Sequence, residues 1–237
     1  MLRCLRRAAL TLAGLVVAFH VCALEIAQVA KQVLERSEAF REGEGLRRHE
    51  MQPELAAAAG EFARYMASSG RYGHTADART PAQRATAHGY DYCIVLENIG
   101  YVYRSRGYSS ADAVAEDLVE GWKKSPEHRA AMLDAAATQT GVGIARDDSG
   151  RYFGVQMFGR PKRAAIRFSV ANSSGTAIDY RTGERVFSLP PRATREHIVC
   201  RPVTLQITLP GKAQPQAIRA SDGATYTVTH SAIVRSP

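Results

Sequence analysis

Apolar residues recur at helical spacing through the first two thirds of the chain. Between Leu24 and about Glu42 they fall near one face of a helix, which Gly43 and Gly45 would end. A second helix is expected from Pro53, where the missing N–H of proline costs nothing in a first turn, to Gly70. Its apolar positions recur at i, i+4, i+7 and i+11, at Leu55, Ala59, Phe62 and Met66.

Three further helices are marked by their N-terminal residues. Thr80 and Gln83 form the pattern of a capping box around Pro81, and Ser109 with Asp112 opens the next predicted helix. Ser125 is expected to cap the last one, with Pro126 in its first position. These helices alternate with runs typical of strands.

The predicted strands place the chain in the α+β class. Residues 90–103 are rich in β-branched and aromatic side chains, and residues 140–159 suggest a hairpin turning at Asp147–Gly150. Helical patterns stop near Pro161. We therefore expect a body over residues 24–161 and a small all-β C-terminal domain over 162–237, with four candidate strands: Ala165–Val170, Ile198–Cys200, Val203–Leu209 and Thr225–Thr229.

Residues 1–23 have the layout of an export signal. Three arginines precede an apolar run from Ala8 to Val21, and small residues follow, so cleavage is expected before Leu24. A retained anchor is the alternative, although the run is shorter than the ~20 residues that a spanning helix needs. We expect a periplasmic or extracellular protein that is not integral to the membrane after cleavage.

Removal of the signal leaves two cysteines, Cys93 and Cys200. An oxidising compartment would permit a disulfide between them, which would stabilise the fold by roughly 4–5 kcal/mol in the chain-entropy model. Two separate buried thiols are the alternative, because a sequence does not give the geometry.

Charge is concentrated in the predicted tail. The whole chain has a formal net charge of +8; residues 24–161 carry 17 basic and 19 acidic side chains, whereas residues 162–237 carry 11 and 4. Such a tail suits contact with anionic envelope glycan or lipid head groups, and simple solubility is the alternative. Nucleic acid is disfavoured because the chain is expected to be exported.

Three side chains are candidates for a binding site: His74, Glu97 and His128. Each lies at an irregular position or element end on a different predicted element. His128 is expected in a first helical turn, where the helix dipole favours a neutral imidazole. If the three converge, they would suit Zn²⁺ or a similar divalent cation; the alternative is that the histidines only cap or pack.

The order and spacing of five motifs resemble the CAP superfamily, also called the SCP domain, and its bacterial branch in particular. The motifs are Gly73–Thr75; Thr80–Arg84 with Gly89 and Tyr90; Leu96–Gly100; Gly121 and Trp122 with Ser125–Arg129; and the pair Gly141–Ala145 and Tyr152–Phe158. The resemblance implies an α-β-α sandwich with a central cleft.

His74, Glu97 and His128 match three of the family's cleft positions. Where many relatives have a second acid, this chain has Ser125, and Glu120 or Glu127 would have to take its place. Asn98, beside Glu97, is expected to bond backbone groups rather than a ligand.

The resemblance and the residues together favour an exported binding protein with a metal-capable cleft, whose ligand is lipid-like or an envelope component. A metal-dependent hydrolase, with Glu97 as the base, is the second hypothesis. An envelope scaffold or adhesion protein acting through the basic tail is the third. The missing second acid favours binding, because catalysis would need a tuned acid and base.

Overall fold

The computed structural model describes residues 26–237, so the predicted export signal lies outside the described residues. The chain divides into two compact units, one ending at Gly159 and the other spanning Arg160–Pro237. Along residues 26–237, no helix has the length and apolar character needed to cross a membrane.

The first unit is built on a four-stranded sheet with the order β1-β3-β4-β2. β1 is only Glu50–Met51 and runs parallel to β3, Gln139–Arg146. β3 pairs antiparallel with β4, Tyr152–Pro161, and the turn between them is the hairpin that the sequence predicts. β2, Tyr92–Val102, is the edge strand next to β4 and lies within the predicted strand region.

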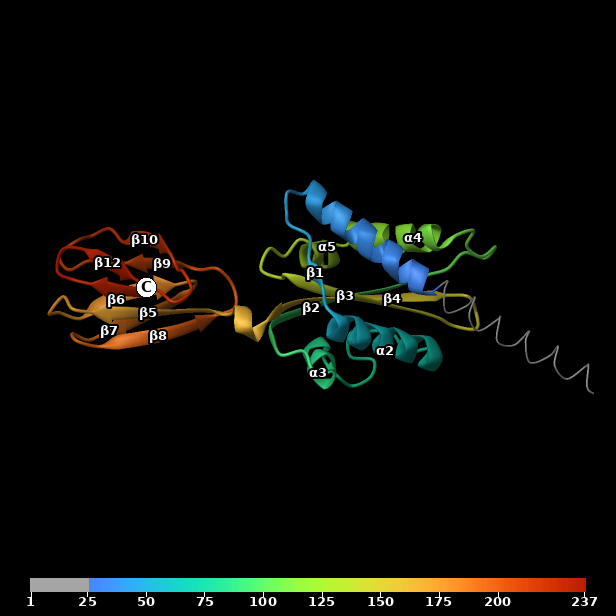
Figure 1. Ribbon diagram of the computed structural model, residues 1–237, viewed down its shortest axis with the longest axis horizontal. Coiled ribbons are helices and arrows are strands. Elements are labelled where there is room, and N and C mark those ends of the chain that lie inside the picture. Colours follow the sequence, from blue (N-terminus) through green and yellow to red (C-terminus); the bar gives the residue numbers. More distant parts are fainter. Residues whose placement is uncertain (1–25) are drawn as a thin grey trace, which may run out of the picture. The chain divides into compact units, whose positions relative to one another are not determined.

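Helices cover both faces of this sheet (Figure 1). On one face α2, Pro53–Ser69, and α3, Pro81–Ala87, bury a core that includes Phe62 and Val155. On the other face the helix over residues 26–43, α4, Ala111–Lys124, and α5, Pro126–Met132, bury a core around Trp122 and Phe158. The predicted α-β-α sandwich is confirmed.

Two helix ends follow their local sequence as predicted. α2 ends at Gly70, which has the left-handed φ of 68° that glycine adopts without strain. Thr80 and Gln83 form a complete capping box at α3, with the Gln83 N–H donating to Thr80 Oγ1 and the Thr80 N–H to Gln83 Oε1.

Two predicted caps are wrong in detail. α4 begins after Ser110 rather than Ser109, and Ser110 Oγ accepts the Ala113 N–H at 3.1 Å. Ser125 does occupy the N-cap position of α5, but its hydroxyl donates to Glu127 Oε2 at 3.3 Å and accepts no backbone N–H. The hydroxyl is instead oriented toward the Glu127 carboxylate.

Two glycines in β3 allow α2 to lie directly against the sheet. A Cβ at Gly141 would stand 2.1 Å from Ala56 N, and one at Gly143 would stand 2.1 Å from Gly60 N. Backbone and backbone are thus in contact, which only glycine permits at these positions.

The second unit is all β, as predicted, and begins after a short 3-10 turn at Lys162–Ala164. Two four-stranded sheets, with orders β10-β9-β6-β7 and β12-β11-β5-β8, enclose one core that includes Phe168, Leu205 and Tyr226. The eight strands are β5, Ile166–Asn172; β6, Ile178–Thr182; β7, Arg185–Leu189; β8, Thr194–Val199; β9, Thr204–Ile207; β10, Gln216–Arg219; β11, Thr225–Val228; and β12, Ile233–Ser236.

Cys93 and Cys200 form a disulfide. Of the two alternatives that the sequence leaves open, the structure therefore selects the cross-link rather than two separate thiols.

Candidate functional site

Three different elements supply the predicted site residues. His74 follows α2 in a loop whose preceding residue, Gly73, has a φ of 135° and so requires glycine. Glu97 lies in the middle of β2, and His128 is the third residue of α5. The structure brings all three to one region of the first unit.

His74 and Glu97 are in direct contact. His74 Nδ1 lies 2.9 Å from Glu97 Oε1, and the side chains are 48% and 1% exposed respectively. The carboxylate accepts a hydrogen bond from Nδ1, so in the neutral imidazole it is Nε2 that keeps the lone pair. The buried acid therefore orients an exposed imidazole whose free nitrogen is a donor atom for a ligand.

His128 lies beside His74, with ring centroids 6.3 Å apart and planes tilted by 52°. Burial is the main cause that lowers the pKa of His128; a protonated His74 lowers it further, whereas Glu127 acts in the opposite direction. The imidazole is thus biased toward its neutral, ligand-competent form. Asn98 Nδ2 donates to the His128 carbonyl at 3.0 Å and ties α5 to β2, which is the predicted bonding to backbone.

Arg84 is the residue of this region that the sequence did not identify as functional. Its side chain is 1% exposed, and Nη2 lies 2.8 Å and 2.7 Å from the two carboxylate oxygens of Glu97. Nη2 also donates to the His74 carbonyl, at 2.9 Å, while the guanidinium stacks 3.5 Å from the centroid of Phe62. The sequence predicts that Arg84 lies in the short helix after the capping box, but it gives no sign that the side chain is buried.

The other nitrogen of Arg84, Nη1, donates to Asp77 Oδ1 at 2.8 Å. Asp77 also accepts from Arg79, and Arg79 reaches Glu61 at 2.6 Å. Burial alone would raise the pKa of Asp77, but the Arg79 N–H and the two guanidinium groups outweigh it, so that the pKa is lowered. An ionised network thus supports the loop that carries His74.

Sequence comparison places this domain in a family. The model of the family described as "CAP: Cysteine-rich secretory protein family" matches residues 34–158, which is more than half of the chain. The chain belongs to the CAP family. A search of curated proteins finds no match.

Three solved structures are similar to this chain. An outer surface protein from Borrelia burgdorferi is 19% identical, with a TM-score of 0.50 over 56% of this chain and 93% of that one. An extracellular SCP-domain protein of Bacillus anthracis is 22% identical, with a TM-score of 0.47, and a cysteine-rich secretory protein of Staphylococcus aureus is 18% identical, with a TM-score of 0.45. The matches cover 56% and 57% of this chain and 40% of each of those proteins.

The CAP site suits a cation held by two imidazoles rather than by three protein ligands. Among residues 26–237, no three His, Cys, Asp or Glu side chains are grouped closely enough to hold a metal ion together. Both Glu97 oxygens accept from Arg84, and Ser125 stands in place of the second acid. Imidazole nitrogens are suitable donors for Zn²⁺, Ni²⁺ and Cu²⁺, so His74 and His128 are the side chains of this site that could serve as ligands to such an ion, with water as the remaining ligands.

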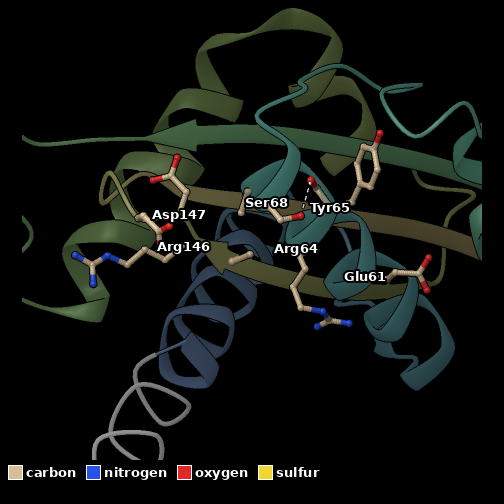
Figure 2. A pocket seen from close by; sticks show the side chains of 9 residues that line it. Glu61, Arg64, Tyr65, Ser68, Arg146 and Asp147 are labelled. Carbon is tan, nitrogen blue, oxygen red and sulfur yellow. Dashed lines mark hydrogen bonds between the residues drawn. The ribbon is translucent and has the colours of Figure 1, made fainter.

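A separate hollow of about 660 Å³ lies between α2 and the end of β3 in the CAP domain. None of His74, Glu97 and His128 lines it. Figure 2 shows that the guanidinium groups of Arg64 and Arg146 point in different directions there, so they do not converge on one position. The lining of this hollow mixes acidic and basic side chains, and they do not form a cluster of one charge.

Proposed function

We propose that the chain is an exported CAP-domain binding protein whose His74 and His128 bind a divalent cation. The observation that carries the proposal is the chain of contacts from Arg84 through Glu97 to His74 Nδ1. Carboxylates that fix a histidine in this way are the usual support of metal-binding imidazoles. A bound ion would supply an electrophilic centre with open positions for the oxygen of a ligand.

Binding is favoured over metal-dependent hydrolysis by the surroundings of Glu97. A general base needs a lone pair that can reach water or substrate. The Glu97 carboxylate is almost fully buried and accepts from Arg84 and His74, so its geometry suits a positioning role. We therefore propose ligand binding as the activity of the cleft.

Export is supported by the signal-like pattern of residues 1–23 and by the Cys93–Cys200 disulfide, since structural disulfides persist in oxidising compartments. N-terminal sequencing of the protein from a periplasmic or culture fraction should begin at Leu24. Recovery of only the uncleaved chain from the cytoplasm would contradict export.

Calorimetric titration of the mature chain with Zn²⁺, after removal of any histidine tag, tests the site. Binding should be lost in His74→Ala and in His128→Ala, and Glu97→Gln should weaken it about 10- to 100-fold because the support of His74 is reduced. His230→Ala, an exposed histidine of the second unit, is the control and should bind as the wild type does. Equal binding by wild type, His74→Ala and His128→Ala would refute the proposal.

A further inference from the structure

A second pocket in the CAP unit has a different character. It measures about 290 Å³ and lies where the loop after β2 meets the hairpin turn between β3 and β4. This is near the lower end of the size range of small-molecule sites. Its lining contains arginine, tyrosine, serine and glycine but no acidic residue: Tyr103, Arg104, Ser105, Gly107, Tyr108, Arg146, Ser149, Gly150 and Tyr152.

One wall of this pocket is held rigidly by Asp117 on α4. Arg104 donates to both oxygens of Asp117, at 2.9 Å and 2.7 Å, and the Tyr108 hydroxyl donates to the same carboxylate at 2.9 Å. Burial and the bond to Asp117 raise the pKa of Tyr108 to about 12, so the phenol stays neutral. The Arg104 guanidinium also lies 4.9 Å from the Tyr108 ring centroid, and its charge is balanced by Asp117.

A second cation of the lining, Arg146, is not balanced by an acidic partner among the described residues. Arg146 lies over the Tyr152 ring at 5.5 Å, and Tyr152 meets Tyr108 edge-to-face with centroids 5.7 Å apart. Arg146 forms no salt bridge with any residue of the described chain, whereas the neighbouring Asp147 is paired with Arg151. Among its lining residues the pocket therefore has a net positive charge, and the Arg146 guanidinium is exposed and available to an anion.

The lining also includes an exposed aromatic ring. Tyr103 is 55% exposed, which leaves much of its side chain uncovered by protein. A tyrosine ring offers an apolar face for the C–H groups of a sugar, while its hydroxyl stays in water. The serine hydroxyls of the two loops add neutral hydrogen-bonding groups around the arginine.

We propose that this pocket binds an acidic sugar residue, with its carboxylate on Arg146 and its ring against Tyr103. A carboxylate matches the fork of a guanidinium, and the polar lining excludes an acyl chain. The His74–His128 site has other residues, so this proposal stands or falls separately from the cation site. An acidic polysaccharide is the class of partner that such a subsite recognises.

The probe is trigalacturonic acid, titrated calorimetrically into the mature chain, with the neutral maltotriose as the comparison. Arg146→Gln should weaken binding of the acidic trisaccharide at least tenfold, and Tyr103→Ala should weaken it several-fold. Arg106→Gln removes the same charge from the loop after β2 without changing a residue of the pocket lining, and it should bind as the wild type does. His74→Ala should also retain binding.

Several outcomes would overturn the proposal. Equal losses in Arg146→Gln and Arg106→Gln would show general attraction of an anion to a basic surface. Loss in Arg64→Gln would place the ligand in the larger hollow, which Arg146 also lines. Equal affinity for maltotriose would remove the role of the carboxylate, and displacement of the trisaccharide by phosphate at the same molar concentration would show that the sugar ring contributes nothing.

Discussion

At the scale of single residues, Arg84 is the side chain on which most of the site depends. It is the only arginine or lysine paired with Glu97 among the described residues, and it is also paired with Asp77. Burying a carboxylate is costly unless it is paired and hydrogen-bonded. Arg84 thus supplies the paired, hydrogen-bonded partner that the buried Glu97 carboxylate needs next to His74.

Replacing Arg84 with Ala should lower the free energy of unfolding by about 3–5 kcal/mol, because two buried carboxylates lose a partner. Arg84→Lys should lower the free energy of unfolding by a smaller amount, since an ammonium group keeps the charge but cannot span both carboxylates. Urea unfolding followed by the fluorescence of the single tryptophan, Trp122, measures the change. Arg36→Ala, which removes an exposed ion pair with Asp112, is the control and should change little; equal effects would contradict the argument.

His197 is the second residue whose surroundings have a measurable consequence. Its ring stacks on Phe168 at 4.9 Å, meets Phe187 at 5.0 Å, and lies 2.8 Å through Nε2 from the Tyr180 hydroxyl. Burial, and then the charge of Arg195, lowers the pKa of His197. The native second unit therefore favours the neutral ring, whereas the unfolded chain takes up a proton near the ordinary pKa of about 6.5.

The second unit should accordingly lose stability as the pH falls through about 6.5 toward the lowered native pKa, because the unfolded state then binds more protons. His197→Phe keeps an aromatic ring and should remove this pH dependence. His230→Ala should preserve it. Hydrogen exchange of peptides from Arg160–Pro237, corrected for the intrinsic effect of pH, measures the change; a pH dependence that survives in His197→Phe would refute the assignment.

At the scale of secondary-structure elements, the close packing of α2 on β3 depends on two residues of the strand that have no side chain. Gly141 and Gly143 are two residues apart, so both face the same side of the sheet, and each faces backbone atoms of α2. This close packing fixes the distance between α2 and the sheet. It therefore also fixes the position of the C-terminal end of α2 and of the following loop, which contains His74. The glycines therefore position the site without contacting it.

Gly143→Ala should destabilise the first unit by at least about 3 kcal/mol, because the added Cβ meets backbone that has no rotamer with which to move aside. Gly121→Ala is a matched control. Gly121 lies exposed within α4 and nothing stands within 4 Å of its Cβ position, so alanine there should stabilise by about 0.5–1 kcal/mol. Trp122 fluorescence in urea reports both, and a neutral Gly143→Ala would contradict the close packing.

At the scale of the whole molecule, local signals predicted most elements and distant contacts explain the rest. The α2 periodicity, the Thr80 capping box and the turn at Asp147–Gly150 are set by neighbours in sequence, and each is confirmed. The meeting of His74 with Glu97 came from family resemblance, because 22 residues separate them. The role of Arg84 was not predicted because its partners lie on other elements of the structure, Asp77 in a loop and Glu97 on β2. Strand β7 was not predicted because its five residues are mostly exposed and show no clear apolar alternation.

The disulfide gives the chain a second covalent connection across position 160, since Cys93 precedes that position and Cys200 follows it. A protease recognition site in place of Lys162–Ala164, a turn outside all three hydrophobic cores, should allow the backbone to be cut. The cut protein should migrate as one species in denaturing gels without reductant and as two with it. Cys200→Ser should yield two species in both gels, and two species from the cut wild type without reductant would show that the pairing is absent.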